Sequence, residues 1–254
     1  SDVYKRQTSY CLKKLSQENH EVHAVCINTG GFSDNDIKSM EKRAYEIGAY
    51  RYKNVHGLET FYNKIVKYLI FGNVLKNNTY PLSVSAERII QAVEIVSYAK
   101  SINAKYIAHG STGAGNDQVR FDMIFQILAP EIEIISLIRD QNLSRESEIK
   151  YLNSHGINIS WEKAKYSINT GLWGTSIGGA ETLNSRDPLP ESAYPNKVIK
   201  SESEELQIEF KTGELFAING KKGKPFELIQ RLQILARDFG TVSYTHLTLP
   251  TSYP

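Results

Sequence analysis

Short β-strand patterns alternate with helix patterns over residues 8–160, and this alternation leaves few possible folds. Residues 21–28, 50–56, 105–110 and 131–136 are rich in apolar and β-branched side chains, which is typical of strands. Helical spacing occurs around them, over 10–17, 33–48, 58–75, 86–103, 116–130 and 144–156. The pattern predicts an α/β fold with a parallel sheet and helices on both of its faces.

Glycine-rich turns follow two of these strand patterns. Gly30 and Gly31 come soon after the first strand, and Gly110, Gly113 and Gly115 fall within six residues after the third. Parallel sheets bind ligands at the carboxyl ends of their strands. The two turns therefore predict one ligand site at that edge of the sheet.

The stretch HGSTGAGND combines backbone freedom with polar side chains. Glycine lets a backbone approach a ligand closely, and the free N–H groups at a helix start suit an anion. Thr112 can donate to a carboxylate, Asp117 can hold an ammonium, and Arg120 can bind a carboxylate through two hydrogen bonds. The set fits an amino acid beside a phosphate-bearing ligand. A glycine-rich turn before a capped helix fits the spacing equally well, because no standard phosphate-loop motif is present.

Two other segments hold polar candidates. Tyr80 and Ser85 belong to a loop predicted over 77–85, and Ser167 and Ser176 flank an apolar Leu-Trp pair. From the sequence alone, solvent-exposed loop residues explain both pairs more simply than a binding site does.

Composition and spacing argue against several classes of function. A formal net charge of +2 at pH 7 gives no basic field for nucleic acid, and no apolar run is long enough to cross a membrane. The six histidines lack metal-ligand spacing, and no Ser-His-Asp arrangement can be argued. Cys11 and Cys26 lie in apolar contexts as reduced core residues, which predicts a cytoplasmic protein.

The character of the chain changes at Trp161. Loop-rich segments are followed by an antiparallel hairpin predicted over 206–220 and a helix predicted over 225–240, which together indicate a second, α+β domain over 161–241. Residues 1–7 and 242–254 resemble translated sequencing adapter, in part a transposase mosaic end. We expect both ends to be artefacts that truncate the biological chain.

Taken together, the motifs resemble the argininosuccinate synthase family. YIAHGSTGAGNDQVRF is similar to that family's signature for nucleotide and amino-acid binding, and YPLSVS to its citrulline-binding segment. YSINTGLWGTSIGG and LPESAYP are similar to its later segments. The resemblance covers residues 8–241. It implies a parallel-sheet, adenine-nucleotide alpha hydrolase-like (PP-loop, Rossmann-like) domain over 8–160 and a truncated α+β synthetase domain over 161–241.

The resemblance implies a ligase that joins citrulline and aspartate using ATP with Mg²⁺, through a citrullyl-adenylate, and releases AMP and pyrophosphate. It implies a cytoplasmic homotetramer in arginine biosynthesis, without nucleic-acid or membrane partners. No side-chain nucleophile is implied, because catalysis would rest on positioning and charge stabilisation. The ATP contacts would be Thr8, Ser9, Ile27 and Gly110. The aspartate contacts would be Thr112, Asn116 and Asp117. The citrulline contacts would be Tyr80, Ser85, Asn116, Arg120, Ser167 and Ser176.

Three departures from the family pattern bear on activity. Only Thr8-Ser9 remains of a pyrophosphate loop of the form S-G-G-x-D-T-S, so we expect the chain as written to bind ATP poorly. Ala114 and Ala86-Glu87 replace the usual residues, which leaves open the amide-bearing amino acid that is preferred. The family's downstream citrulline-binding residues and oligomerisation helix would lie beyond Thr241.

Two other functions stay open at this point. Another adenylating ligase of the same superfamily, such as a tRNA-thiolating or amidating enzyme, would need a different acceptor. A non-catalytic nucleotide-binding module would bind ATP without releasing pyrophosphate. Polar residues on three separate loops argue against that module, since nucleotide binding alone would not need them.

Overall fold

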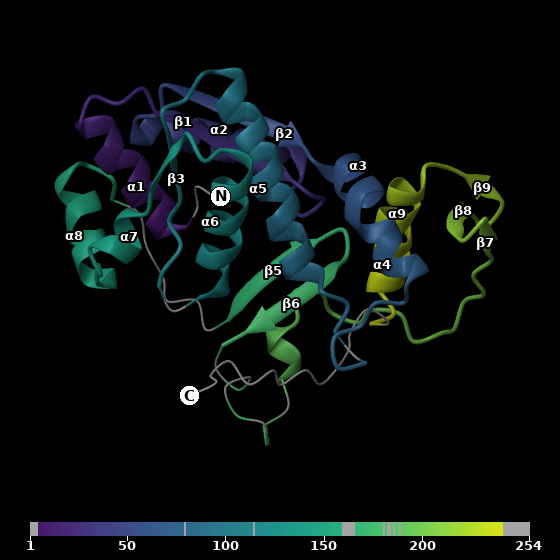
Figure 1. The fold of residues 1–254 in the computed structure, drawn as a ribbon. Coiled ribbons are helices and arrows are strands. Elements are labelled where there is room, and N and C mark those ends of the chain that lie inside the picture. Colours follow the sequence, from purple (N-terminus) through teal and green to yellow (C-terminus); the bar gives the residue numbers. More distant parts are fainter. Residues whose placement is uncertain are drawn as a thin grey trace. The chain divides into compact units, whose positions relative to one another are not determined.

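The computed structural model of the chain divides into two compact units. The first comprises residues 1–57 and 87–163, and the second comprises residues 58–86 and 164–254 (Figure 1). Structure is described for residues 5–78, 80–113, 115–158, 166–179, 181, 184, 186, 187 and 189–240. The predictions for residues 1–4, Ala114 and 242–254 therefore lie outside the described residues. The domain bounds 8–160 and 161–241 stay a prediction, and by packing residues 58–86 group with the later part of the chain.

The strands of the first unit pair in parallel, which confirms the α/β prediction. β1 (His23–Asn28) pairs with β2 (Arg51–His56), and Ile27 lies opposite Val55. β3 (Tyr106–Ala108) pairs with β4 (Glu133–Ile135) in the same sense. Parallel neighbours place their carboxyl ends at one edge, so the turns that follow β1 and β3 begin at equivalent ends of their strand pairs.

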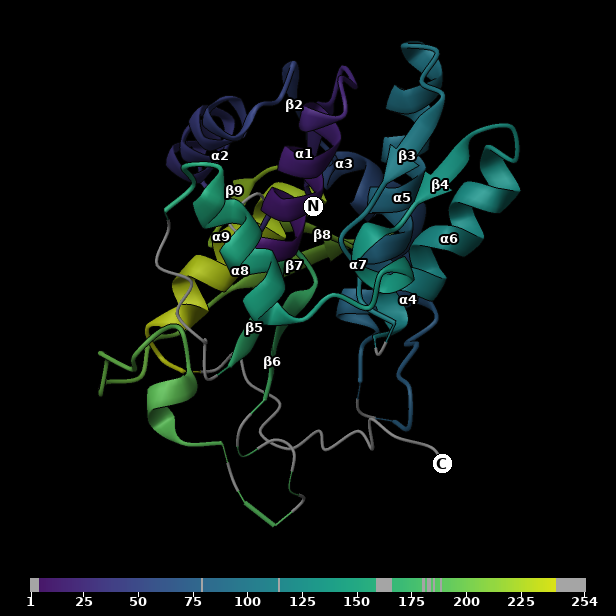
Figure 2. The ribbon, with the colours of Figure 1, turned by 90° about the vertical axis from the view of Figure 1, so that its left-hand side faces the viewer.

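Two cores hold the helices of the first unit on these strand pairs. The helices α1 (Arg6–Gln17), α2 (Asp34–Ile47), α7 (Leu137–Asp140) and α8 (Arg145–Ser154) share one core with β1 and β2. The helices α5 (Ser83–Ser101) and α6 (Asn116–Leu128) share the other with β3 and β4, beside which Figure 2 shows them. Helix α5 begins in the second unit and continues into the first.

The start of α2 is closed by a capping box between Ser33 and Asp36. The Ser33 hydroxyl accepts from the Asp36 N–H at 3.3 Å, and the Asp36 carboxylate accepts from the Ser33 N–H at 2.9 Å. This capping box satisfies two backbone donors that the helix itself cannot pair. The helix ends at Gly48, whose φ of 124° avoids the cost that a side chain would add.

The single helix predicted over 58–75 is wrong. The segment forms α3 (Leu58–Phe61), the π-helical turn η1 (Tyr62–Val66) and α4 (Lys67–Phe71). Phe61 and Val66 are five residues apart and are 1% and 0% exposed. A π turn places residues at that spacing on one face, whereas a regular α-helix does not. Burial of both side chains therefore accounts for the interruption.

The remainder of the second unit consists of hairpins and one long helix. β5 (Ser167–Gly171) pairs with β6 (Gly174–Gly178) in an antiparallel hairpin. β7 (Ile208–Lys211), β8 (Glu214–Ile218) and β9 (Lys221–Lys222) form an antiparallel sheet on which α9 (Pro225–Arg237) packs. A short 3₁₀ turn, η3, covers Glu191–Ala193. The hairpin predicted over 206–220 and the helix that follows it are confirmed.

The loop predicted over 77–85 is three residues too long, because α5 begins at Ser83. The Tyr80 hydroxyl accepts a hydrogen bond from the Val84 N–H at 3.1 Å, so a loop side chain satisfies a donor of the first turn of α5. Within the part of the chain that is described, no helix is both long and apolar enough to cross a bilayer.

Candidate functional site

The glycine-rich turn between β3 and α6 lies against the first turn of α1. The His109 N–H donates to the Ile135 carbonyl at 3.1 Å, which continues the β3–β4 pairing into the turn. A Cβ atom at Gly110 would lie 3.1 Å from the Gln7 carbonyl carbon and 3.2 Å from the Thr8 nitrogen. Only glycine fits this approach without a shift of the backbone. The contact brings together Gly110 and Thr8, two of the residues predicted to bind ATP.

The other two residues predicted to bind ATP are buried. Ser9 follows Thr8 in the first turn of α1 and is 0% exposed. Ile27 is 3% exposed near the end of β1, and a Cβ atom at Gly57 would lie 2.9 Å from its Cγ2. The Ile27 side chain thus belongs to the core, and only its backbone could meet a ligand. A core strand shows the same burial, so the ATP contact at Ile27 stays a prediction.

The side chain of Asn28 forms the turn after β1. Its Oδ1 accepts from the Gly30 N–H at 3.0 Å, and its Nδ2 donates to the Phe32 carbonyl at 3.0 Å. Gly30 has a φ of 101°, a conformation in which glycine is favoured. The Gly30-Gly31 signal in the sequence therefore reflects a tight turn at the carboxyl end of β1.

Two residues predicted to hold amino acids pair with each other at the start of α6. Arg120 Nη1 donates to Asp117 Oδ1 at 2.8 Å, one turn apart on the same helix. The neighbouring candidates Thr112 and Asn116 are exposed beside them. The pair offers a carboxylate for an ammonium and a guanidinium for a carboxylate. An amino acid carries both of those partner groups.

A second arginine reaches Asp117 from α5, and the sequence did not single it out. Arg88 Nε donates to Asp117 Oδ2 at 3.0 Å, so both carboxylate oxygens of Asp117 are paired. Next to it, the Glu87 carboxylate is buried and accepts from the Thr29 hydroxyl. Burial raises the pKa of Glu87, and the Thr29 hydrogen bond and the Arg88 charge oppose that rise. The available signal in the sequence was an acid next to a base, Glu87-Arg88, just before the apolar pair Ile89-Ile90.

A buried histidine fixes the base of the glycine-rich turn and was also missed. His109 is 6% exposed, and its Nε2 lies 2.8 Å from Asp122 Oδ1. Its Nδ1 accepts from the Ser111 N–H at 3.3 Å, so the ring hydrogen on Nε2 points toward Asp122. Arg139 donates to the other Asp122 oxygen at 2.5 Å. The chain Ser111–His109–Asp122–Arg139 ties the turn to α6 and α7.

In the second unit, the two weaker candidate segments are joined by a hydrogen bond. Trp173 Nε1, in the turn of the β5–β6 hairpin, donates to the Pro81 carbonyl at 2.8 Å. Pro81 follows Tyr80 in the chain, while Ser85 Oγ donates to the Leu82 carbonyl at 3.2 Å. Ser176 lies half-buried on β6 opposite Asn169. The side chain of Ser167 lies outside the described parts, although its backbone belongs to β5.

The predicted citrulline contacts are divided between the units. Asn116 and Arg120 belong to the first, and Tyr80, Ser85, Ser167 and Ser176 belong to the second. Each unit thus holds a local cluster of predicted residues: the turn and α6 in the first, and the Trp173–Pro81 junction in the second.

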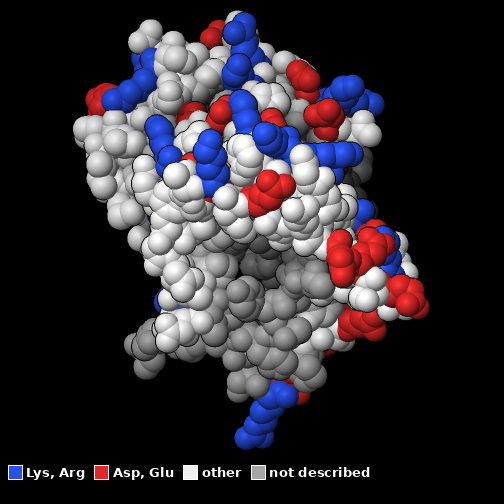
Figure 3. Space-filling view, turned by 90° about the vertical axis from the view of Figure 1, so that its right-hand side faces the viewer, with Lys and Arg blue, Asp and Glu red and all other residues white. Residues whose placement is uncertain are grey.

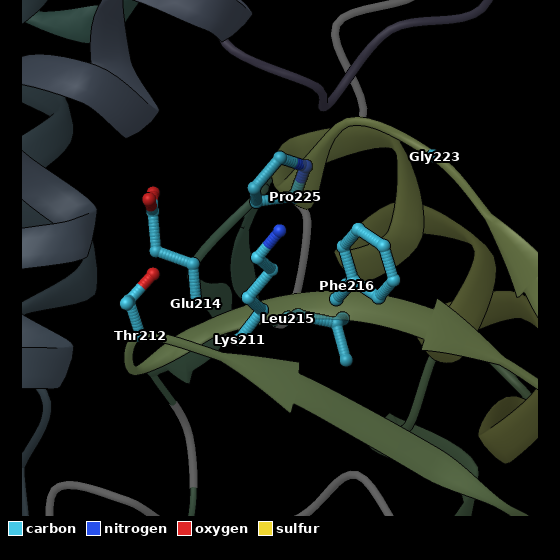
Figure 4. Close-up of a pocket in the computed structure, with 7 residues that line it drawn as sticks. All are labelled: Lys211, Thr212, Glu214, Leu215, Phe216, Gly223 and Pro225. Atoms are coloured by element: carbon cyan, nitrogen blue, oxygen red, sulfur yellow. The ribbon is translucent and has the colours of Figure 1, made fainter.

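One face of the molecule shows mixed charge, and a hollow in the second unit lies away from the predicted residues. On the face in Figure 3, Asp and Glu side chains lie among the Lys and Arg side chains, so neither sign forms an extended field among its described residues. The hollow in Figure 4 lies on the β7–β8 hairpin, with Lys211, Glu214 and Phe216 around it. None of the predicted site residues lines it. Over the described ranges, no cluster of three or more His, Cys, Asp or Glu side chains could hold a metal ion.

Comparison with known proteins finds one family along most of the chain. The sequence model described as "Arginosuccinate synthase N-terminal HUP domain" matches residues 6–158. Argininosuccinate synthase of Methanocaldococcus jannaschii is 39% identical over 237 residues, which are 92% of this chain and 60% of that protein. The enzymes of the same name from Sulfurisphaera tokodaii and Lactococcus lactis subsp. lactis are 36% and 34% identical, each over 94% of this chain. The chain spans 60–62% of the length of these relatives.

Proposed function

The chain belongs to the argininosuccinate synthase family, and on that premise we propose that it contributes to the ATP-dependent joining of citrulline and aspartate. One observation carries the proposal. The turn that holds Gly110 packs against Thr8, and the helix that the turn opens presents Asp117 and Arg120 as an ion pair. The helix that opens at this turn therefore presents a pair of charges suited to an amino acid.

ATP would be consumed as a substrate in this reaction. The ureido oxygen of citrulline attacks the α-phosphorus, and pyrophosphate leaves. The aspartate amine then displaces AMP from the citrullyl-adenylate. Positioning and charge stabilisation supply the catalysis, because the mechanism requires no side-chain nucleophile. Mg²⁺ would arrive with the ATP phosphates, which is how that ion is usually held in ATP-dependent enzymes.

The proposal gives each predicted residue a role. The ATP contacts are Thr8, Ser9, Ile27 and Gly110. The aspartate contacts are Thr112, Asn116 and Asp117. The citrulline contacts are Tyr80, Ser85, Asn116, Arg120, Ser167 and Ser176. Assembly into a homotetramer and a cytoplasmic location also belong to the proposal, and the family resemblance supports them.

Substrate binding would exchange one ion pair for two. Asp117 and Arg120 pair with each other at 2.8 Å, with side chains 39% and 28% exposed. The ammonium of aspartate would form an ion pair with the Asp117 carboxylate, and the carboxylate of citrulline would form one with the Arg120 guanidinium. Asp117 and Arg120 would each keep an opposite partner throughout, so binding leaves neither of these two protein charges unpaired.

We propose further that the chain as written binds ATP poorly. Lys5, Arg6 and Gln7 precede Thr8 where the family has a glycine-rich loop. Arg6 donates to the buried Glu148 at 2.8 Å, and Gln7 is the residue that meets Gly110. Side chains and an ion pair thus stand where close backbone approach to phosphate is expected.

The test is pyrophosphate release from ATP. It uses the chain with an N-terminal strand, an S-G-G-x-D loop and a C-terminal segment of the family added, beside the chain as written. Both are assayed with citrulline and aspartate together and with each omitted. Release that needs citrulline, in the extended protein only, is the expected result. Release that is indifferent to citrulline would indicate another adenylating ligase, and ATP binding without release would indicate a binding module.

A further inference from the structure

Arg88 is a largely buried cation whose contacts include three side-chain acceptors. Its side chain is 11% exposed near the start of α5. It donates to Asp117 Oδ2 at 3.0 Å, to Gln91 Oε1 at 3.1 Å and to Glu87 Oε2 at 3.4 Å. A guanidinium with that little exposure needs such partners, because an unpaired buried charge is strongly destabilising. Its orientation is therefore fixed by the surrounding groups.

Glu87 accepts from a different Arg88 nitrogen than Asp117 does, Nη1 and not Nε. The Glu87 side chain is 9% exposed, and the Thr29 hydroxyl at the end of β1 donates to its other oxygen. The contacts form one continuous series from Thr29 through Glu87 and Arg88 to Asp117. The series links the turn after β1 to the first turn of α6, two segments that follow strands of separate parallel pairs.

The two arginines that hold Asp117 differ in their freedom to move. Arg120 donates to Oδ1, and its side chain is 28% exposed. A substrate carboxylate would therefore compete with Asp117 for Arg120. Arg88 takes Oδ2 and is held by Glu87 and Gln91 as well. When Arg120 turns to a ligand, the hydrogen bond from Arg88 Nε still holds Asp117 Oδ2. Oδ1 then faces the position that Arg120 has left.

We propose that Arg88, anchored by Glu87 and Thr29, is a positioning residue that holds Asp117 ready for the ammonium of aspartate. This inference rests on the proposed function, in which Asp117 receives that ammonium. Arg88 does not touch the substrate. Its effect falls on aspartate binding, because pre-organisation of one carboxylate oxygen lowers the cost of ordering the site.

The kinetic test uses the extended protein described above, with Arg88→Gln and Arg88→Lys variants. Arg88→Gln should raise the KM for aspartate by about tenfold, the size of effect expected for one buried charged hydrogen bond, and leave the KM for ATP within about twofold. Arg88→Lys should recover part of the loss, because an ammonium can still reach Asp117. Lys100→Gln is the matched control on α5, since its exposed ion pair with Glu131 at 3.1 Å lies away from this series.

Opposite results would overturn the inference. Loss of a cation beside Asp117 should, by charge alone, strengthen the attraction for an ammonium. A lower KM for aspartate in Arg88→Gln would therefore show that charge, and not positioning, governs the site. Equal changes in the KM values for aspartate and ATP would show a merely structural role for Arg88.

A second measurement separates this inference from the proposed function. In the 254-residue chain, NMR of the arginine side chains should show an Arg88 Nε–H that exchanges slowly with solvent and loses that protection in Asp117→Asn. A rapidly exchanging Arg88 Nε–H in the unaltered chain would overturn the positioning role, whatever the enzyme does. A protected Nε–H together with no citrulline-dependent pyrophosphate release by the extended protein would overturn the proposed function.

Discussion

At the scale of single residues, Gly110 allows close packing because it has no Cβ atom. An alanine Cβ would lie 3.1–3.2 Å from the carbonyl carbon and Cβ of Gln7 and from the Thr8 nitrogen. These atoms belong to the α1 backbone or are bonded to it, so a rotamer change cannot move them away. We expect Gly110→Ala to lower the free energy of unfolding by about 1–3 kcal/mol, as overpacking commonly does. Urea unfolding followed by circular dichroism measures the loss.

Gly113→Ala in the same turn is the control for that substitution. Its Cβ atom would meet Arg139 Cγ at 3.7 Å, an ordinary contact distance. The unfolding midpoint of this variant should stay close to that of the unaltered chain. Equal losses in the two variants would mean that the turn needs glycine for its flexibility, and the packing explanation for Gly110 would fail.

Glu87 predicts a pH dependence of stability. Burial raises its pKa above 4.5 in the folded chain, although the Thr29 hydrogen bond and the Arg88 charge act against it. The folded state then holds the proton more tightly than the unfolded state, so stability falls as the pH rises from 4.5 through the folded pKa. Glu87→Gln cannot lose that proton. Its stability relative to the unaltered chain should improve as the pH rises through this range.

Denaturant unfolding of both proteins at several pH values from 4 to 8 measures this difference. The comparison between the two chains removes the contribution of acids that do not contact Glu87. A difference in stability that stays constant with pH would show that Glu87 ionises as easily in the folded chain as in the unfolded one.

Sequence reasoning found the side chains of α6 but not their partners. Asp117 and Arg120 lie one helical turn apart, so local spacing was enough to place them together. Arg88 and Asp117 are 29 positions apart, and Thr29 and Glu87 are 58 positions apart. Periodicity carries no information on such pairs, because the packing of α5 against its neighbours decides them. Glu87 was noticed only as a departure from the family pattern.

At the scale of elements, the capping box of α2 makes a measurable contribution. Ser33→Ala removes the hydroxyl that accepts from the Asp36 N–H, and should cost about 1 kcal/mol of stability near neutral pH. The Ser33 hydrogen bonds also lower the pKa of Asp36 below 3.8, so their stabilisation is lost as the pH falls through that folded pKa.

Thermal or urea unfolding of Ser33→Ala at neutral pH and near pH 3 tests both statements. The difference from the unaltered chain should shrink at the lower pH. Lys38→Ala, an exposed change one turn further along α2, is the control and should have little effect. A Ser33→Ala cost that is the same at both pH values would mean that Asp36 takes no part in the cap.

The elements that the sequence predicted poorly are those whose ends are set by packing. The cap at Ser33 and the stop at Gly48 are local signals, and α2 follows both. The interruption at η1 has no local signal, since neither glycine nor proline occurs between Leu58 and Phe71. Burial of Phe61 and Val66 together decides it. A helix template with a period of 3.6 residues could not have shown this.

At the scale of the whole molecule, the two units are assembled from interleaved stretches of the chain. Residues 58–86 pack with a part of the chain that begins more than seventy residues later. The Tyr62 hydroxyl donates to Glu214 at 3.0 Å, Lys224 reaches Glu59 at 3.2 Å, and the Tyr62 and Phe226 rings are 6.5 Å apart. The second unit is thus joined by contacts distant in sequence, which sequence patterns alone did not predict.

This grouping predicts which elements should lose protection from hydrogen exchange when a core residue is substituted. Phe226 is 8% exposed at the start of α9, and Phe226→Ala should cost about 3–5 kcal/mol through the lost burial and the cavity left behind. Hydrogen exchange followed by mass spectrometry should then show faster exchange in η1 and β8 as well as in α9. Exchange in α2 and β1 should change far less, because those elements belong to the other unit.

A core substitution in the first unit completes the test. Ile47 is 1% exposed in the core that α2 shares with β1, and Ile47→Ala should speed exchange there while η1 and β8 keep their protection. Opposite patterns in the two variants would establish that residues 58–71 unfold with the later unit. If Phe226→Ala instead left η1 protected, the contacts of Tyr62 and Glu59 would be too weak to join the two stretches. Faster exchange throughout both units in each variant would mean that the chain unfolds as one cooperative body, and continuity through α5 would then be the simplest reason.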